Sequence, residues 1–131
     1  MAQQAAGHLI PRRYLRYPVP STLHVVAEFN LPPNLVHLGR LRDISVIGAC
    51  LALSGRQRIP THSEGLVVIH SPESLGQLSM LAQVRWSAPT NDLTLLGVEF
   101  TEGQLAEGTF LDTFITGTWV NGQQEVLEES Y

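Results

Sequence analysis

The 131-residue sequence contains no lysine, so all eight of its permanently basic side chains are arginines. Its one cysteine, Cys50, excludes an internal disulfide and a metal site of the CxxC type. No apolar run approaches the roughly 18 residues that a membrane-spanning helix needs, and the first residues lack the basic and then apolar pattern of a signal peptide. These absences predict a cytoplasmic protein without membrane insertion.

The charges that are present are unevenly distributed. The net charge of −4 argues against a surface for DNA or RNA. Between residues 8 and 42, however, Glu28 is the only acid, and the same stretch contains five arginines: Arg12, Arg13, Arg16, Arg40 and Arg42. Such a local cluster on an acidic protein suggests one small anionic ligand. The alternative is a solvated arginine face that binds nothing.

Short segments with a period near two, or with buried apolar character, follow one another between turn-forming residues. We predict six strands, over residues 21–29, 35–45, 48–55, 64–71, 76–88 and 91–102. Strands of this length and spacing suggest an antiparallel barrel or sandwich, and a closed barrel would also remove the exposed strand edges.

The hydrophobic period changes after residue 101. Apolar residues in 102–119 recur at near-helical spacing, which predicts a C-terminal helix that packs across the barrel mouth or against a partner, or simply covers the core. We therefore divide the chain into a flexible arm (1–10), an all-β barrel domain with its helix (11–118) and an acidic, frayed tail (119–131).

The segment PRRYLRYPV, residues 11–19, places three arginines just before the first predicted strand. Pro11 and Pro18 favour an extended path over a long helix. The planar, forked guanidinium pairs bidentately with phosphate oxygens or with guanine O6 and N7. Arg12, Arg13 and Arg16 could therefore converge on one ligand.

The segment DISVIGAC, residues 43–50, interrupts an apolar run with three residues that a buried strand does not need. Asp43 can accept hydrogen bonds from a donor pair such as guanine N1–H and N2–H, Ser45 can bond a phosphate, and Gly48 allows a tight turn or a close ligand. In the alternative reading, Asp43 and Ser45 cap a tight turn and Gly48 has a positive φ. The apolar residues that follow are predicted core.

Taken together, Arg12-x-x-x-Arg16 and Asp43-x-Ser45-x-x-Gly48 resemble the two motifs of the PilZ domain family. This resemblance implies a six-stranded split β-barrel that binds cyclic di-GMP, with both motifs at the ligand. Arg13 lies between the motif arginines and is a weaker candidate. Pro11 stands where some relatives have a further arginine, which favours one ligand molecule per site.

The resemblance extends over roughly residues 11–117, because VRWSAPTNDLTLLGVEF (84–100) looks like the last two PilZ strands. Trp86 in this segment could stack on a guanine face, as in similar PilZ strands, or could simply pack at the barrel rim. The histidines lack metal-ligand spacing, and we find no catalytic motif. We expect no enzyme, no metal and no cofactor.

Three functions compete at this stage. The first is a cyclic di-GMP receptor whose arginine arm becomes ordered on binding and so signals to an unidentified downstream protein. The second is a protein-interaction module that keeps the barrel but works without ligand. A nucleic-acid-binding barrel is disfavoured by the negative charge and the sparse aromatic residues.

Overall fold

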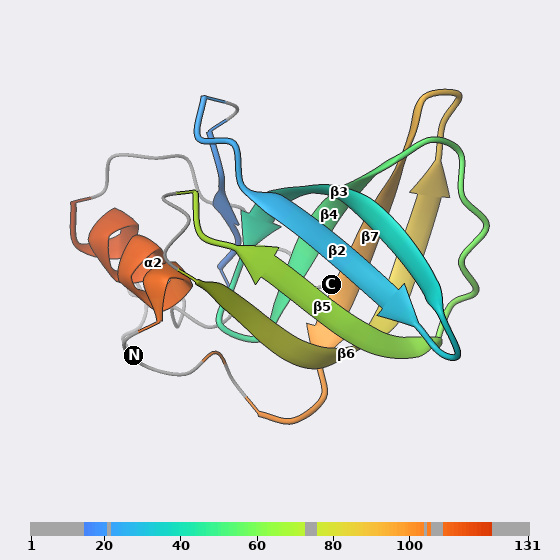
Figure 1. Cartoon of the computed structure of the whole chain (residues 1–131). Helices are drawn as coiled ribbons and strands as arrows, with labels where there is room; N and C mark the ends of the chain where they lie inside the picture. The colour runs from blue at the N-terminus through green and yellow to red at the C-terminus, as the bar shows by residue number, and fades with distance from the viewer. Residues whose placement is uncertain (1–14, 21, 73–75, 104, 106–108, 122–131) are drawn as a thin grey trace, which may run out of the picture.

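The computed structural model describes residues 15–20, 22–72, 76–103, 105 and 109–121. Its elements are short strands followed by one helix (Figure 1). They are β1 Tyr17–Pro18, β2 Val26–Leu31, β3 Leu35–Ile44, β4 Gly48–Ser54, β5 Glu64–His70, β6 Gln77–Pro89, β7 Leu93–Phe100 and α2 Phe110–Asn121. The predicted all-β architecture with a C-terminal helix is confirmed.

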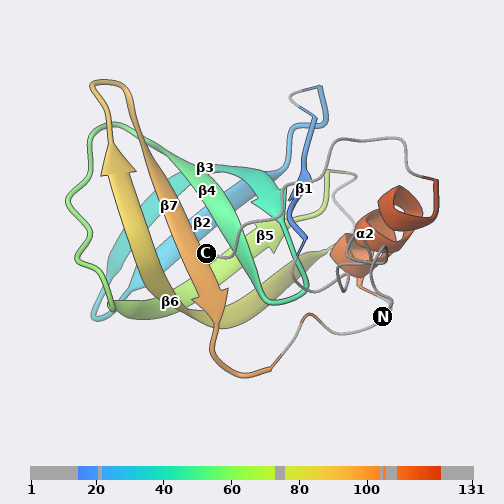
Figure 2. The ribbon, with the colours of Figure 1, turned by 180° about the vertical axis from the view of Figure 1, so that it is seen from behind.

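The strands form a closed antiparallel barrel. Strand neighbours follow the order β3, β2, β5, β6, β7, β4, and β4 pairs back with β3, so six strands complete the ring. The two-residue β1 joins the outside of this ring by pairing with the end of β3. Figure 2 views the barrel from the side of β4, β6 and β7. The six-stranded barrel predicted from the sequence is therefore confirmed.

The first predicted strand is shorter than expected. The alternation starts at residue 21, but β2 begins only at Val26. The Leu23 N–H donates to the Pro20 carbonyl at 2.9 Å, which closes a turn where the pattern suggested extended chain. A hydrophobic period alone does not reveal such a local hydrogen bond.

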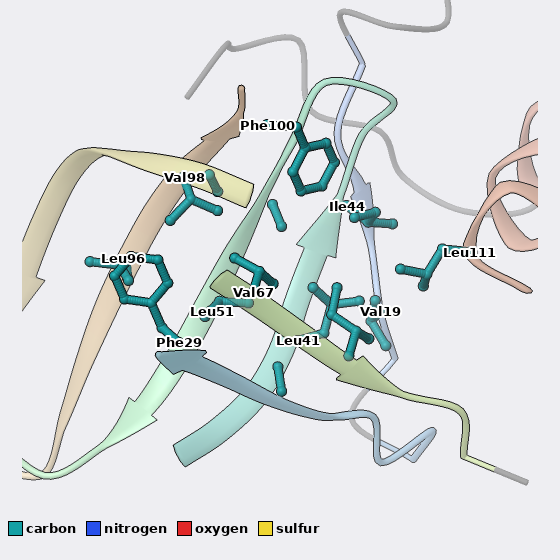
Figure 3. Close-up of a cluster of buried hydrophobic side chains, with 14 of the residues drawn as sticks. Val19, Phe29, Leu41, Ile44, Leu51, Val67, Leu96, Val98, Phe100 and Leu111 are labelled. Carbon is teal, nitrogen blue, oxygen red and sulfur yellow. The ribbon is translucent and has the colours of Figure 1, made fainter. Parts of the chain in front are cut away.

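The barrel interior is filled by alternate side chains from every strand (Figure 3). On β4, Ala49, Leu51 and Leu53 belong to this core, and each is fully buried. Because successive side chains point to opposite faces of a strand, Cys50 and Ala52 point outward. The prediction that the whole apolar run is buried is confirmed, but Cys50 and Ala52 are buried on the outer face and not in the barrel interior.

Helix α2 covers one end of the barrel. Leu111 and Ile115 are buried and belong to the same apolar cluster as the strand residues (Figure 3). The helix begins after Thr109, whose Oγ1 accepts a hydrogen bond from the Asp112 N–H at 3.1 Å, a typical N-cap. Among the residues that the structure describes, no helix is long and apolar enough to cross a bilayer.

Candidate functional site

The turn between β3 and β4 is held by the side chain of Ser45. The Ser45 N–H donates to the Gly48 carbonyl at 2.9 Å. The Ser45 Oγ accepts hydrogen bonds from the Ile47 and Gly48 N–H groups, at 3.2 and 3.1 Å. The capping role that the alternative reading gave to Ser45 is therefore real, and the hydroxyl is held in one place by the backbone.

Gly48 does not have the positive φ that the same reading expected. Among the described glycines, positive φ angles occur at Gly55, Gly76 and Gly103. Gly48 is instead the first residue of β4, buried, and registered opposite Glu99 of β7. Gly48 follows the tight turn at Ser45 directly. Because glycine has no side chain, its backbone lies close to the outer face of the barrel.

Barrel closure aligns residues from five strands in one row. Pro18 pairs with Asp43, Asp43 with Cys50, Cys50 with Gly97, and Gly97 with Trp86. The row therefore crosses β1, β3, β4, β7 and β6 in turn. Since neighbouring strands lie about 4.8 Å apart, Asp43 and Trp86 are separated by three strand spacings, or roughly 14 Å along the backbone.

Arg16 lies at one end of this row. Tyr17 pairs with Ile44, and both side chains are fully buried in the core. Arg16 directly precedes Tyr17, so its side chain lies on the face away from the core, near the turn that follows Ile44. The pairing of β1 with β3 thus brings this part of the chain to the end of β3, just before the turn at Ser45.

The burial of Asp43 sets the electrostatic character of the row. Only 4% of Asp43 is exposed, so its carboxylate lies where charge interactions are screened less than on an open surface. Arg42, the neighbouring residue, is exposed. Arg40, which pairs with Ala52 two residues along β4 from Cys50, is partly exposed on the same outer face.

The pKa of the Cys50 thiol shows which charged side chains lie near the middle of the row. Burial, and to a smaller extent the Asp43 carboxylate, raise the pKa of this thiol to about 12, although Arg42 and Arg16 act in the opposite direction. The Asp43 carboxylate on β3 and the Arg16 guanidinium, which precedes β1, thus both affect the pKa of the Cys50 thiol. The sequence predicted Cys50 as part of the apolar core but did not place it between these charges.

This pKa predicts that the Cys50 thiol reacts very slowly in the folded protein. With a pKa of about 12, only about 10⁻⁴ of the thiol is ionised at pH 8. We expect alkylation by iodoacetamide at pH 8 to be at least about 100-fold slower in the native protein than in urea. Mass spectrometry of timed samples measures both rates, and comparable rates would contradict the burial of this side chain.

Trp86 is held at the other end of the row by a glycine. A Cβ built on Gly97 would lie 2.3 Å from both Cε2 and Nε1 of the Trp86 indole. The ring therefore rests directly on the Gly97 backbone, and Trp86 remains partly exposed. The sequence offered a signal for this contact, because a glycine inside a strand often marks a close approach.

Two candidate residues from the sequence, Arg12 and Arg13, lie outside the described residues. Of the others, the register brings Arg16, Asp43 and Ser45 together beside β3 and β4. Trp86 lies on the same row but two strands beyond β4, so it and Asp43 could contact opposite parts of one extended ligand. The result is an outward-facing strip with an aromatic ring at one end and opposite charges at the other.

Comparison with known proteins gives the chain a family. A family model described as the PilZ domain matches residues 11–117. Among curated proteins, none matches the sequence.

Two solved structures share the fold. One is the PilZ domain with c-di-GMP of YcgR from Escherichia coli, 15% identical, with a TM-score of 0.61 over 87% of this chain and 95% of that one. The other is YcgR in complex with c-di-GMP from Escherichia coli, 16% identical, with a TM-score of 0.58 over 88% of this chain and 47% of that one. This chain thus spans about half of the longer YcgR structure.

Proposed function

Since this chain belongs to the PilZ domain family, we propose that it is a receptor for cyclic di-GMP and that the outer strip of the barrel is its binding site. The observation that carries the proposal is the register that aligns Asp43 with Trp86, together with the charge of Arg16, which acts with that of Asp43 on Cys50 in the same row. Both YcgR structures that share the fold contain c-di-GMP, which supports the choice of ligand.

The chemistry of the strip suits a ligand with two guanines and two phosphates. The Asp43 carboxylate is an acceptor and matches the guanine N1–H and N2–H donors. The Arg16 guanidinium offers a planar fork to a phosphate or to guanine O6 and N7. The Trp86 indole provides a flat apolar face on which a purine can stack.

Ser45 and Gly48 have a positioning role in this proposal. Because the Ser45 hydroxyl already accepts two backbone N–H groups, its main contribution is a rigid turn that fixes Asp43 relative to Arg16. Any hydrogen bond from Ser45 to the ligand would use the hydroxyl proton, which now faces the Gly48 carbonyl at 3.4 Å. Gly48 lets the ligand approach the backbone at the start of β4.

Signalling requires a change that another molecule can read. We assign this change to the arginine segment: the ligand pairs with Arg12, Arg13 and Arg16, and so orders the N-terminal arm against the barrel. The surface created or covered in this way is read by a downstream protein. In this proposal the ligand binds the ordered arrangement of the arm more tightly than any other arrangement, because only the ordered arm makes the arginine contacts. This difference in affinity drives the ordering.

Isothermal titration calorimetry with cyclic di-GMP tests the proposal. We expect saturable binding of cyclic di-GMP and much weaker binding of cyclic di-AMP, because adenine presents no N1–H and N2–H donor pair to Asp43. Hydrogen exchange with and without ligand tests the arm: protection should increase over residues 8–16. Absence of binding by the wild-type protein would overturn the receptor function and favour the ligand-independent interaction module.

A further inference from the structure

The first half of β3 exposes large apolar side chains. Leu35, Val36 and Leu38 are 55%, 56% and 55% exposed. They belong to the β2–β3 hairpin, which lies at the end of the barrel opposite α2 (Figures 1 and 2). Single exposed apolar residues need no explanation, but Val36 and Leu38 share the outer face of the strand, next to the exposed Leu35, and together they form an apolar end that calls for one.

The same residues also leave a strand edge open. β3 pairs with β2 as far as Leu35, but its pairing with β4 reaches only to Gly39. The chain that follows β4 does not continue along β3, because the Gly55 N–H donates to the Asp92 carbonyl at 2.9 Å. In the part of the chain that the structure describes, residues 35–38 therefore have no strand on the β4 side.

The backbone direction identifies the groups on this open side. The Leu41 N–H donates to the Val25 carbonyl of the segment before β2, at 2.8 Å. Since hydrogen-bonding direction alternates along an antiparallel strand, Leu35 and His37 also direct their backbone groups toward β2. The N–H and C=O of Val36 consequently point toward the open side.

The charge of the hairpin favours association with an identical chain. Residues 29–39 contain no aspartate, glutamate, lysine or arginine. In a twofold antiparallel pair centred on Val36, Val36 faces its own copy, Leu35 faces His37 and Leu38 faces Asn34, so the pairing brings no like charges of Asp, Glu, Lys or Arg together. Natural proteins commonly protect open edges with charged side chains, and residues 35–38 contain no aspartate, glutamate, lysine or arginine. A neutral, apolar, unprotected edge is therefore suited to a second copy of itself.

We propose that the edge of β3 from Leu35 to Leu38 is a self-association surface, on which two copies of this chain pair antiparallel about a twofold axis at Val36. Each Val36 N–H donates to the Val36 carbonyl of the other copy, which joins the two barrels into one continuous sheet. The Val36 and Leu38 side chains of both copies pack together on the outer face. The pairing involves no residue of the proposed ligand site and needs no ligand.

Sedimentation equilibrium of the wild-type protein over a range of concentrations, with charge variants, tests this surface. We expect a reversible dimer for the wild type, and a monomer for Val36→Lys and Leu38→Lys. Because both side chains are more than half exposed, the variants should keep the wild-type circular dichroism spectrum and unfolding temperature. The matched control is Leu81→Lys, since Leu81 is 42% exposed but lies on β6; this variant should remain dimeric.

A backbone measurement separates strand pairing from simple contact of apolar side chains. In the dimer, the Val36 amide should exchange slowly with solvent, and it should lose this protection in Leu38→Lys. A wild-type protein that stays monomeric at high concentration would overturn the proposal. So would dissociation by Leu81→Lys to the same extent as by Leu38→Lys, or a Val36 amide that exchanges rapidly in the dimer.

Discussion

Replacing Arg16 with alanine is expected to weaken cyclic di-GMP binding by about 10- to 100-fold, because hydrogen bonds to charged groups contribute about 1.5–3 kcal/mol each and each tenfold in affinity corresponds to about 1.4 kcal/mol. Arg16 is only partly exposed and lies beside the turn at Ser45. Titration calorimetry of the variant and of the wild type at one salt concentration measures the difference.

The matched control is Arg58→Ala. Arg58 is exposed and lies between β4 and β5, away from the aligned row, so its loss changes the net charge equally without removing a proposed contact. Affinity should remain within about twofold of the wild type, because exposed charges at a distance are largely screened. Equal losses of cyclic di-GMP affinity in Arg16→Ala and Arg58→Ala would show that Arg16 acts only through its charge at long range and makes no direct contact with the ligand.

Asp43→Asn provides the complementary test of guanine recognition. The amide has nearly the shape of the carboxylate, so the packing around this 4% exposed side chain is preserved. It removes a pure acceptor, and we expect a similar loss of cyclic di-GMP affinity and a smaller preference over cyclic di-AMP. An unchanged preference would exclude Asp43 as the residue that reads the guanine edge.

Gly97→Ala is expected to lower the free energy of unfolding by about 1–3 kcal/mol, the usual cost of forcing an extra methyl group into a packed site. The new methyl group would meet the Trp86 indole 2.3 Å away, so the ring must leave its place on β7. Chemical denaturation followed by circular dichroism measures the loss. The displaced indole should also weaken cyclic di-GMP binding if Trp86 stacks on a guanine.

A double-mutant cycle tests whether the cost arises from this one contact. In a Trp86→Ala background, Gly97→Ala should cost much less, because the clashing ring is gone. Gly65→Ala is the control: its methyl group would meet the Asn30 carbonyl at 2.6 Å, far from Trp86 along β6, and its cost should be the same in both backgrounds. Equal costs of Gly97→Ala in the two backgrounds would contradict the contact.

Much of the fold was predictable because its signals are local. Alternation of apolar residues located six strands, and the near-helical spacing within residues 102–119 located α2, although the helix begins only at Phe110 and continues to Asn121. The turn at Ser45 was also foreseeable, since the serine bonds groups only two and three residues away. Where local hydrogen bonds competed with the period, as at Leu23, the prediction was wrong.

The candidate site was predictable only as two separate pieces. The sequence contains an arginine segment and a turn with Asp43, and the resemblance to PilZ domains joined them in advance of the geometry. Nothing in the spacing indicated that Cys50 points outward between Asp43 and Gly97, and the glycine within β7 signalled a close approach without identifying Trp86 as the residue that makes it. Those relations depend on the register of strands that are up to fifty residues apart in the chain.

The sequence by itself determined the elements, the family and the chemical types of the proposed ligand contacts, because propensity, alternation and turn chemistry act over a few residues. The tertiary structure alone decided which side of each strand faces the core and which residues share the outer row. It also leaves residues 35–38 of β3 without a neighbouring strand on the β4 side, among the residues that the structure describes. The physical reason is that closing a barrel fixes all strand registers together, and a register is a property of paired strands rather than of either sequence segment.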